Sequence, residues 1–175
     1  MEKIEKQKCP VCLTNNLTLT QEEMDIPYFG RAYLFSMQCN NCNYKKSDVE
    51  GEEQKEPVRI TFEINSENDM NVRVVKSSEA TIKIPQLRMS VEGGPNGEGY
   101  VSNIEGVLDR FKKIIEGERD TSEDAAVKKT AKNLLKKLWK VKMGDIPVKI
   151  IIEDSTGNSA IISKKVVVEK LKVKK

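Results

Sequence analysis

The chain has no histidine among its 175 residues, so histidine general bases, Ser-His-Asp triads and histidine metal ligands are all excluded. No apolar run approaches the 18 residues that indicate a membrane-spanning helix. The first eight residues, MEKIEKQK, are charged and lack the apolar core of a signal peptide. We therefore expect a soluble, cytoplasmic protein with no membrane segment and few groups suited to catalysis.

Cysteine is also scarce, and the four that occur form two C-x-x-C pairs separated by 26 residues. The alternative of two disulfides requires an oxidising compartment, for which the sequence gives no other sign. Two such pairs can place four thiolates around one metal ion at about 2.3 Å, which closes a tetrahedral shell. A closed shell has no open position for water or substrate. We predict one structural zinc ion held by Cys9, Cys12, Cys39 and Cys42.

Charge is distributed unevenly along the chain, although the formal net charge is only +3. Residues 1–50, which contain the cysteines, carry 6 basic and 7 acidic side chains. Affinity for nucleic acids depends mainly on neutralising phosphates, so this region is poorly suited to bind DNA or RNA. A nucleic-acid role for the zinc module is therefore not favoured.

Two short strands, at residues 17–20 and 32–37, are expected between the cysteine pairs, joined through residues 25–30. This pattern predicts a zinc ribbon. The acidic, polar stretch 47–56 contains a glycine and ends before Pro57, which is typical of a linker. We place the domain boundary near residue 54, with a ribbon at 1–54 and a second domain at 55–175.

Apolar residues alternate with period two from Val58 to Val91 and again from Val148 to Ile162, which predicts half-buried antiparallel strands. The consecutive apolar runs 150–152 and 166–168 predict central strands covered on both faces. The resulting fold class is α+β, mostly β: a ribbon followed by a β-sandwich with an inserted helical hairpin.

The hairpin is predicted at about residues 102–143. Ser102 and Glu105 form a capping-box pattern, and Gly117 is a plausible stop for the first helix. The second helix is expected to begin at residues 120–124 and end at Gly144. Its many lysines have two interpretations, an anion-binding face for a ligand such as RNA, or a solvated outer face. These lysines are Lys128, Lys129, Lys132, Lys136, Lys137, Lys140 and Lys142.

Two loops resemble catalytic or phosphate-binding motifs only superficially. The segment 93–99 has the order G-x-x-G-x-G, which matches neither common phosphate-binding loop, and its four glycines predict a mobile connection. A weak anion site at the start of the following helix is the alternative interpretation. The segment 153–159 is typical of a hairpin turn, and its Asp154 lacks the third member of a triad. We expect no enzymatic activity.

Several segments together resemble the ZPR-type zinc-finger proteins in their short, single-copy archaeal form. They are CPVC, DIPYFGRAYLFSMQCNNCNYKKSDVE, IPQLRMSVEGG, Asn103-Ile104-Glu105-Gly106 and DSTGNS. The resemblance covers nearly the whole chain. It implies a ribbon like that of translation initiation factor two beta, followed by a double-stranded β-helix domain with a helical hairpin. It also implies an archaeal source and a function as chaperone or binding partner of the GTP-binding translation elongation factor one-alpha. The alternative is a nucleic-acid-associated ribbon protein of the translation or transcription machinery.

Three loops are predicted to act together on one protein partner: the turn around residues 28–29, the glycine loop 93–99 and the turn 154–159. The partner would have to span the linker to reach all three. Tyr28 and Phe29 are aromatic residues in a small module, as protein-binding anchors often are, although packing against the second domain would explain them equally well. The predicted partner residues are Tyr28, Phe29, Gly94, Gly97, Gly99, Asp154, Gly157, Asn158 and Ser159.

Overall fold

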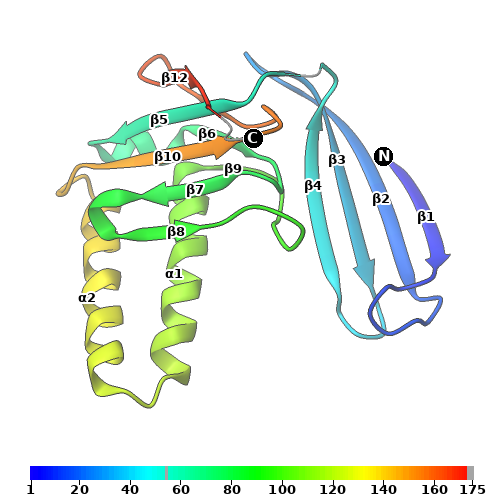
Figure 1. Cartoon of the computed structure of the whole chain (residues 1–175), viewed down its shortest axis with the longest axis horizontal. Helices are drawn as coiled ribbons and strands as arrows, with labels where there is room; N and C mark the ends of the chain where they lie inside the picture. The colour runs from blue at the N-terminus through cyan, green and yellow to red at the C-terminus, as the bar shows by residue number, and fades with distance from the viewer. Residues whose placement is uncertain (54, 173–175) are drawn as a thin grey trace.

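The computed structural model describes residues 1–53 and 55–172. An N-terminal four-stranded antiparallel sheet forms the ribbon, with strand order β1-β2-β3-β4 (Figure 1). Its strands are β1 (Glu2–Gln7), β2 (Leu17–Ile26), β3 (Gly30–Cys39) and β4 (Lys45–Gly51). The ribbon strands are longer than predicted, because β2 and β3 pair without a break from Leu17 opposite Cys39 to Ile26 opposite Gly30. Only a tight turn separates them.

The predicted linker at 47–56 is wrong in its first half, because residues 47–51 belong to β4. Ser47 pairs with Ser36 and Gly51 with Ala32 in the register of β3 and β4. The polar residues of this stretch bind the second domain, as described below, and its one aliphatic residue, Val49, is fully buried. The chain then passes between the domains within a few residues. The boundary predicted near residue 54 falls on a residue outside the described ranges.

The second domain is a sandwich of two antiparallel sheets with a helical hairpin (Figure 1). The larger sheet has the order β12-β5-β10-β7-β8, and the smaller one has the order β11-β6-β9. Its strands are β5 (Val58–Ile64), β6 (Arg73–Lys76), β7 (Thr81–Ile84), β8 (Met89–Val91), β9 (Tyr100–Asn103), β10 (Val148–Asp154), β11 (Ala160–Ile162) and β12 (Val167–Lys170). Two short 3-10 helices, η1 (Glu67–Asn71) and η2 (Pro85–Leu87), complete the connections. The predicted class, mostly β with a helical hairpin, is confirmed.

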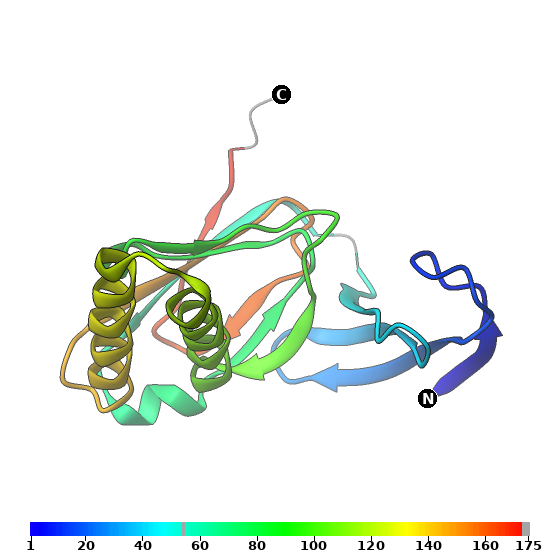
Figure 2. The same ribbon diagram turned by 90° about the horizontal axis from the view of Figure 1, so that it is seen from below.

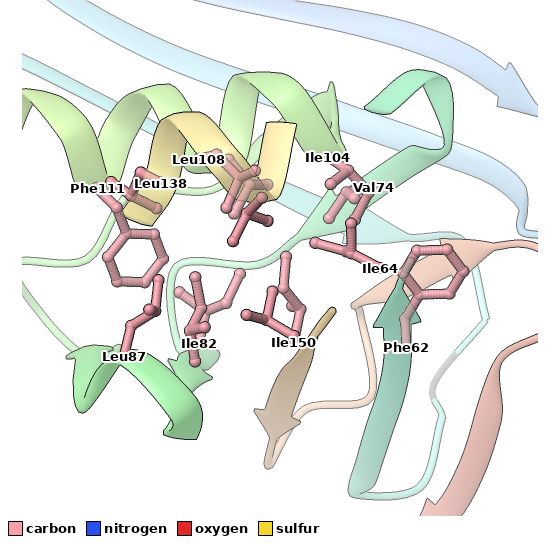
Figure 3. Packing of buried hydrophobic residues seen from close by; sticks show 14 of the residues in the cluster. Phe62, Ile64, Val74, Ile82, Leu87, Ile104, Leu108, Phe111, Leu138 and Ile150 are labelled. Atoms are coloured by element: carbon pink, nitrogen blue, oxygen red, sulfur yellow. The ribbon is translucent and has the colours of Figure 1, made fainter. Parts of the chain in front are cut away.

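The main core lies between the five-stranded sheet on one side and the smaller sheet with the hairpin on the other. Figure 3 shows the two ends of this core: Phe111 and Leu138 of the hairpin face Leu87, and Phe62 lies near Ile64. The central position predicted for residues 150–152 is confirmed, since β10 pairs with both β5 and β7. The predicted cover on both faces is not, because Ile150 and Ile152 are buried while Ile151 on the other face is only half-buried.

The same prediction for residues 166–168 is wrong. Strand β12 pairs only with β5 and forms an edge of the sheet. Val167 and Val168 are 56% and 61% exposed, and all four residues of the strand are exposed. Of the three consecutive valines, Val166 packs against the main core and the next two lie on an uncovered edge, because a continuous apolar run does not by itself say which faces the neighbouring elements cover.

The hairpin consists of α1 (Ile104–Thr121) and α2 (Ala125–Lys142). The predicted capping box is wrong, because Ser102 lies in β9 opposite Val74, and the cap of α1 is Asn103, which accepts a hydrogen bond from the Gly106 amide at 2.8 Å. Helix α1 also continues through Gly117, and α2 starts after its own cap, Asp124. Among the described residues, neither helix has an apolar stretch that would let it cross a membrane.

The smaller sheet is a middle layer with apolar residues on both faces. Val74 and Ile161 point into the main core, whereas their neighbours Val75, Ala160 and Ile162 point to the ribbon. Ribbon residues Ile26, Phe29, Ala32 and Val49 cover this outer face and form a second apolar cluster with it. We call this contact the domain junction. Figure 2 shows the ribbon against the sandwich, with the hairpin at the opposite end of the molecule.

Candidate functional site: the metal centre and the domain junction

Each cysteine pair lies on a turn of the same backbone geometry. In the first, the Cys9 amide donates to the Thr14 carbonyl at 2.8 Å and the Leu13 amide donates to the Cys9 carbonyl at 3.0 Å. The second repeats these bonds between Cys39 and Tyr44 and between Asn43 and Cys39, at 2.8 and 3.0 Å. The residue after each pair, Leu13 or Asn43, has a left-handed φ of about 60°, which turns the chain sharply. The two turns can therefore present their thiols to one point.

The four sulfur atoms match the corners of a zinc-thiolate tetrahedron. With Zn–S distances of about 2.3 Å, such a tetrahedron has edges of roughly 3.8 Å. The Sγ atoms of Cys9 and Cys42 are 3.7 Å apart, those of Cys12 and Cys39 are 3.6 Å apart, and all four lie within 4.8 Å of one another. All four cysteines are free, so none is engaged in a disulfide. The four cysteines are thus placed to bind a single zinc ion.

Hydrogen bonds favour the thiolate form, which binds metal, in two of the four cysteines. The hydroxyl and then the amide of Thr14 lower the pKa of the Cys12 thiol to about 5, and the Cys42 backbone amide lowers the pKa of Cys39. For Cys42 the Tyr44 amide acts in the same direction, but burial and the neighbouring sulfurs outweigh it and raise the pKa to about 12. Zinc must therefore displace at least the Cys42 proton when it binds.

At the domain junction, polar groups of β4 bind the second domain. The Asp48 carboxylate accepts from the Ser78 amide at 2.8 Å and from the Ser78 hydroxyl. Ser47 and Gly99 exchange two bonds, from the Ser47 hydroxyl to the Gly99 carbonyl and from the Gly99 amide to the Ser47 carbonyl, both at 2.8 Å. A Cβ at Gly99 would lie 2.7 Å from the Asp48 Cα, so only glycine permits this approach.

Asp154 is fully buried, and four donors surround its carboxylate. The Thr156 amide and hydroxyl donate to Oδ1 at 2.8 and 2.7 Å, and the hydroxyls of Ser77 and Ser159 donate to Oδ2 at 2.9 and 2.6 Å. The Ser159 hydroxyl also accepts from the Ser77 amide at 3.0 Å. Asn158 extends this turn to the ribbon, where its side-chain oxygen accepts from the Gly51 amide at 3.1 Å. The DSTGNS segment is therefore a structural turn that fixes the two domains together.

The glycine loop is also held in place. Lys76, only 2% exposed, donates from Nζ to the carbonyls of Ser77 and Glu98 at 3.0 and 3.1 Å, and burial lowers its pKa. Lys46 of β4 reaches the Pro95 carbonyl at 2.9 Å, and the Gly94 amide donates to the Ser78 carbonyl at 3.0 Å. The loop predicted to be a mobile connection thus has defined anchors in both domains.

The turn at Tyr28 and Phe29 and the 153–159 turn line one groove between the docked domains, so no partner is needed to bring these two together. The glycine loop contacts the ribbon separately, through Ser47 and Asp48 of β4. Within this set, Tyr28 is 97% exposed, whereas Phe29 is 9% exposed and packs at the junction. Asp154 is fully buried and lies below the surface, whereas Ser159, although only 4% exposed, belongs to the lining of the groove beside Tyr28. The role of the exposed members in partner binding stays a prediction.

Sequence reasoning missed the ribbon half of the junction. Ser47, Asp48 and Lys55 all fall in the stretch predicted as a linker. Lys55 Nζ in fact lies 3.6 Å from the Phe29 ring centre and donates to the Phe29 carbonyl at 3.0 Å. Val49 is the one aliphatic residue of β4, so no alternation of apolar and polar residues marks this strand in the sequence.

The metal centre predicts that zinc affinity rises with pH. The pKa of Cys42 is raised, so zinc displaces its proton across the neutral range, and the apparent affinity should rise by at least about tenfold per pH unit from pH 6 to 8. Below about pH 5 the Cys12 proton also returns, and the dependence should steepen. Competition with a zinc chelator at each pH measures this, with Cys39→Ser as the variant that should lose most of the affinity. A flat pH profile, or zero or two zinc ions per chain, would contradict the assignment.

The buried carboxylate predicts that Asp154→Asn destabilises the protein despite its nearly identical shape. The new amide group takes the place of one carboxylate oxygen, where a hydroxyl can turn to accept from it but the Thr156 amide cannot. The loss therefore corresponds to about one hydrogen bond to a charged acceptor, at about 1.5–3 kcal/mol, together with the weakening of the other bonds. Thermal or urea unfolding should show a loss of roughly 2–4 kcal/mol. The matched control is Asp145→Asn at an exposed position, which should change stability by less than about 0.5 kcal/mol. Equal effects of the two substitutions would show that the network contributes nothing.

Comparison with known proteins finds the ribbon and the second domain together in one family. The ZPR1 zinc-finger domain matches residues 3–56, and the ZPR1 jelly-roll domain matches residues 68–175. An uncharacterized ZPR1-like protein of Methanocaldococcus jannaschii is 40% identical over 163 residues, which cover 93% of this chain and 82% of that protein. A second one, from Pyrococcus horikoshii, is 38% identical over 98% of this chain and 78% of its own length.

Eukaryotic relatives are longer. The zinc finger chaperone zpr1 of Schizosaccharomyces pombe is 32% identical over 77% of this chain, but the match covers only 29% of that protein. The predicted ZPR-type resemblance is confirmed, with the zinc-finger and jelly-roll parts in the order that the structure shows. A four-cysteine ribbon docked on a jelly roll, together with these matches over nearly the whole sequence, establishes that the chain belongs to the ZPR1 family.

Proposed function

We propose that this chain is a protein-binding module of the cytoplasm that acts as a chaperone or binding partner of translation elongation factor one-alpha. Family membership supports the proposal, since the relative from Schizosaccharomyces pombe is named a zinc finger chaperone. The closed thiolate shell also supports it, because a zinc ion held by four cysteines stabilises a binding module and offers no open position for substrate.

The observation that carries the proposal is the position of Tyr28 at the tip of the ribbon. Its ring is 97% exposed, and its backbone has φ of +66°, a left-handed conformation that costs a residue with a side chain about 1 kcal/mol. An exposed aromatic ring in a strained turn is unfavourable for the free protein. Tyrosine is, however, among the residues that contribute most binding energy at protein interfaces.

An apolar groove of about 540 Å³ lies beside Tyr28 and is lined by both domains. The ribbon supplies Tyr28 and Phe29, and the jelly roll supplies Ile162, Val166 and Val168. The edge strand β12, with its exposed valines, forms one wall. We infer that a partner inserts an apolar segment here while Tyr28 packs against it.

Tyr28→Gly tests this surface without weakening the fold. Glycine adopts the left-handed backbone freely, so the substitution removes the ring and relieves strain of about 1 kcal/mol. Purified elongation factor one-alpha, with and without GTP, should bind the wild type and should bind this variant about 30-fold more weakly, as loss of an interface tyrosine worth about 2 kcal/mol requires. Isothermal titration calorimetry gives both affinities.

The control is Ile114→Ala, which removes an exposed apolar side chain of α1 away from the groove and should leave binding unchanged. If the wild type binds the elongation factor in no nucleotide state below roughly millimolar concentration, the partner assignment is wrong. If it binds but Tyr28→Gly binds equally well, the surface is wrong.

We also propose that the chain does not hydrolyse GTP or catalyse another reaction by itself. It has no histidine, and all four cysteine thiols face the metal site. Phosphate release from GTP should match the buffer background. Turnover that disappears when one residue of this chain is substituted would refute the proposal, because a contaminating GTPase would be unaffected.

A further inference from the structure

The outer face of α2 carries a continuous stripe of exposed residues at helical spacing. Lys128, Lys132, Lys136, Trp139 and Met143 follow one another at intervals of four, four, three and four residues, which places them on one side of the helix. All five are exposed, while Ala131, Leu138 and Val141 face the core. We call this set the α2 stripe. Lys129 and Lys140 flank it.

The charge of α2 has one sign. The helix contains seven lysines and no acidic residue. Lys142 pairs with Asp109 at 2.6 Å and with Glu105 at 3.4 Å on α1. Within the described parts of the chain, the other six lysines of α2 take part in no ion pair. Asp120 is an acidic residue that attracts Lys128 at longer range, but its carboxylate is already paired with Arg119 at 2.7 Å. Like charges four residues apart destabilise a helix by about 0.2–0.5 kcal/mol per pair, so this pattern is unfavourable in the free protein.

Trp139 lies within the stripe and is 60% exposed. It is the chain's only tryptophan, a residue that is usually well buried in folded proteins. Met143, one turn further on, is 43% exposed. An open indole face bordered by lysines is the arrangement that stacks on an unpaired base while phosphates are neutralised nearby.

We propose that the α2 stripe binds single-stranded nucleic acid, with the lysines on phosphates and the Trp139 indole stacked on a base. An acidic protein surface is the other anionic partner to consider. The composition disfavours it, because lysine is depleted at protein interfaces and α2 has no arginine to bind carboxylates in a bidentate manner. A row of lysines along about 18 Å of helix also suits a regularly charged strand.

This site is separate from the surface of the proposed function. In Figure 1 the hairpin projects below the sandwich while the ribbon lies at its right, and Figure 2 shows the two at opposite ends. The residues of the α2 stripe belong to neither the groove beside Tyr28 nor the domain junction. Binding at α2 therefore stands or falls independently of the elongation factor.

The fluorescence of Trp139 can report binding, since Trp139 is the one tryptophan and can be excited at wavelengths that the four tyrosines do not absorb. Oligomers of uridine and of thymidine, about 12 nucleotides long, should quench it as they bind. The three lysines of the stripe and the two flanking ones can neutralise five phosphates. The logarithm of the affinity falls with the logarithm of the salt concentration by about 0.7 per phosphate, so the affinity should fall about 100-fold between roughly 50 and 200 mM salt. A preference for one oligomer would identify RNA or DNA as the ligand, and equal binding would fit their shared chemistry.

Two neighbouring lysines provide a matched pair of variants. Lys132→Gln removes a charge from the stripe and should reduce the salt slope by about 0.7. Lys137→Gln removes the same charge from the same helix, but successive residues turn by about 100°, so Lys137 points away and its loss should leave the slope unchanged. Trp139→Leu should weaken binding of a fluorescently labelled oligomer at least about fivefold, measured by anisotropy.

Three results would overturn the proposal. The first is no quenching by either oligomer at about 50 mM salt. The second is binding that Lys132→Gln and Lys137→Gln weaken equally, with Trp139→Leu unaffected, because this would mean unspecific attraction to a basic protein. The third is binding of poly-L-glutamate as tight as that of the oligomers, which would assign the stripe to an acidic protein instead.

Discussion

The middle sheet β11-β6-β9 has apolar residues on both faces, and this constraint determines how the two domains sit. Its inner face completes the core of the jelly roll, and its outer face would be open to water without the ribbon. Undocking would expose Ile26, Phe29, Val49 and Val75, each worth about 1.5–3 kcal/mol when buried. Docking is therefore favoured by up to about 10 kcal/mol of apolar burial before the polar contacts are counted.

The ribbon is stabilised at its two ends by different means. At one end, the metal holds two turns that contribute few buried side chains, with Leu17 the main apolar neighbour of the cysteines. At the other end, the β2–β3 turn and β4 are fixed to the jelly roll by apolar contacts and by the bonds of Asp48, Ser47 and Asn158. The junction fixes the turn that carries Tyr28, so the surface of the proposed function is preformed, which lowers the entropy cost of binding.

The sequence predicted local features well and contacts between domains poorly. Cysteine spacing was sufficient for the metal site, because both ligand pairs lie on short turns whose geometry depends on few residues. Apolar runs do not show which faces are covered: Val167 and Val168 form an exposed edge, whereas Ala160-Ile161-Ile162 form part of the sheet covered on both faces. Stretch 47–56 resembled a linker because its polar side chains bind the other domain, and composition cannot reveal where a hydrogen-bond partner lies.

The domain junction makes ribbon and jelly roll one rigid body, and backbone ¹⁵N relaxation of the zinc-loaded protein tests this most directly. A rigid junction predicts the same rotational correlation time for amides of β2 and β3 as for amides of β5 and β10. A shorter correlation time for the ribbon strands would show that the ribbon tumbles on a flexible tether, and would contradict the account of the domain junction.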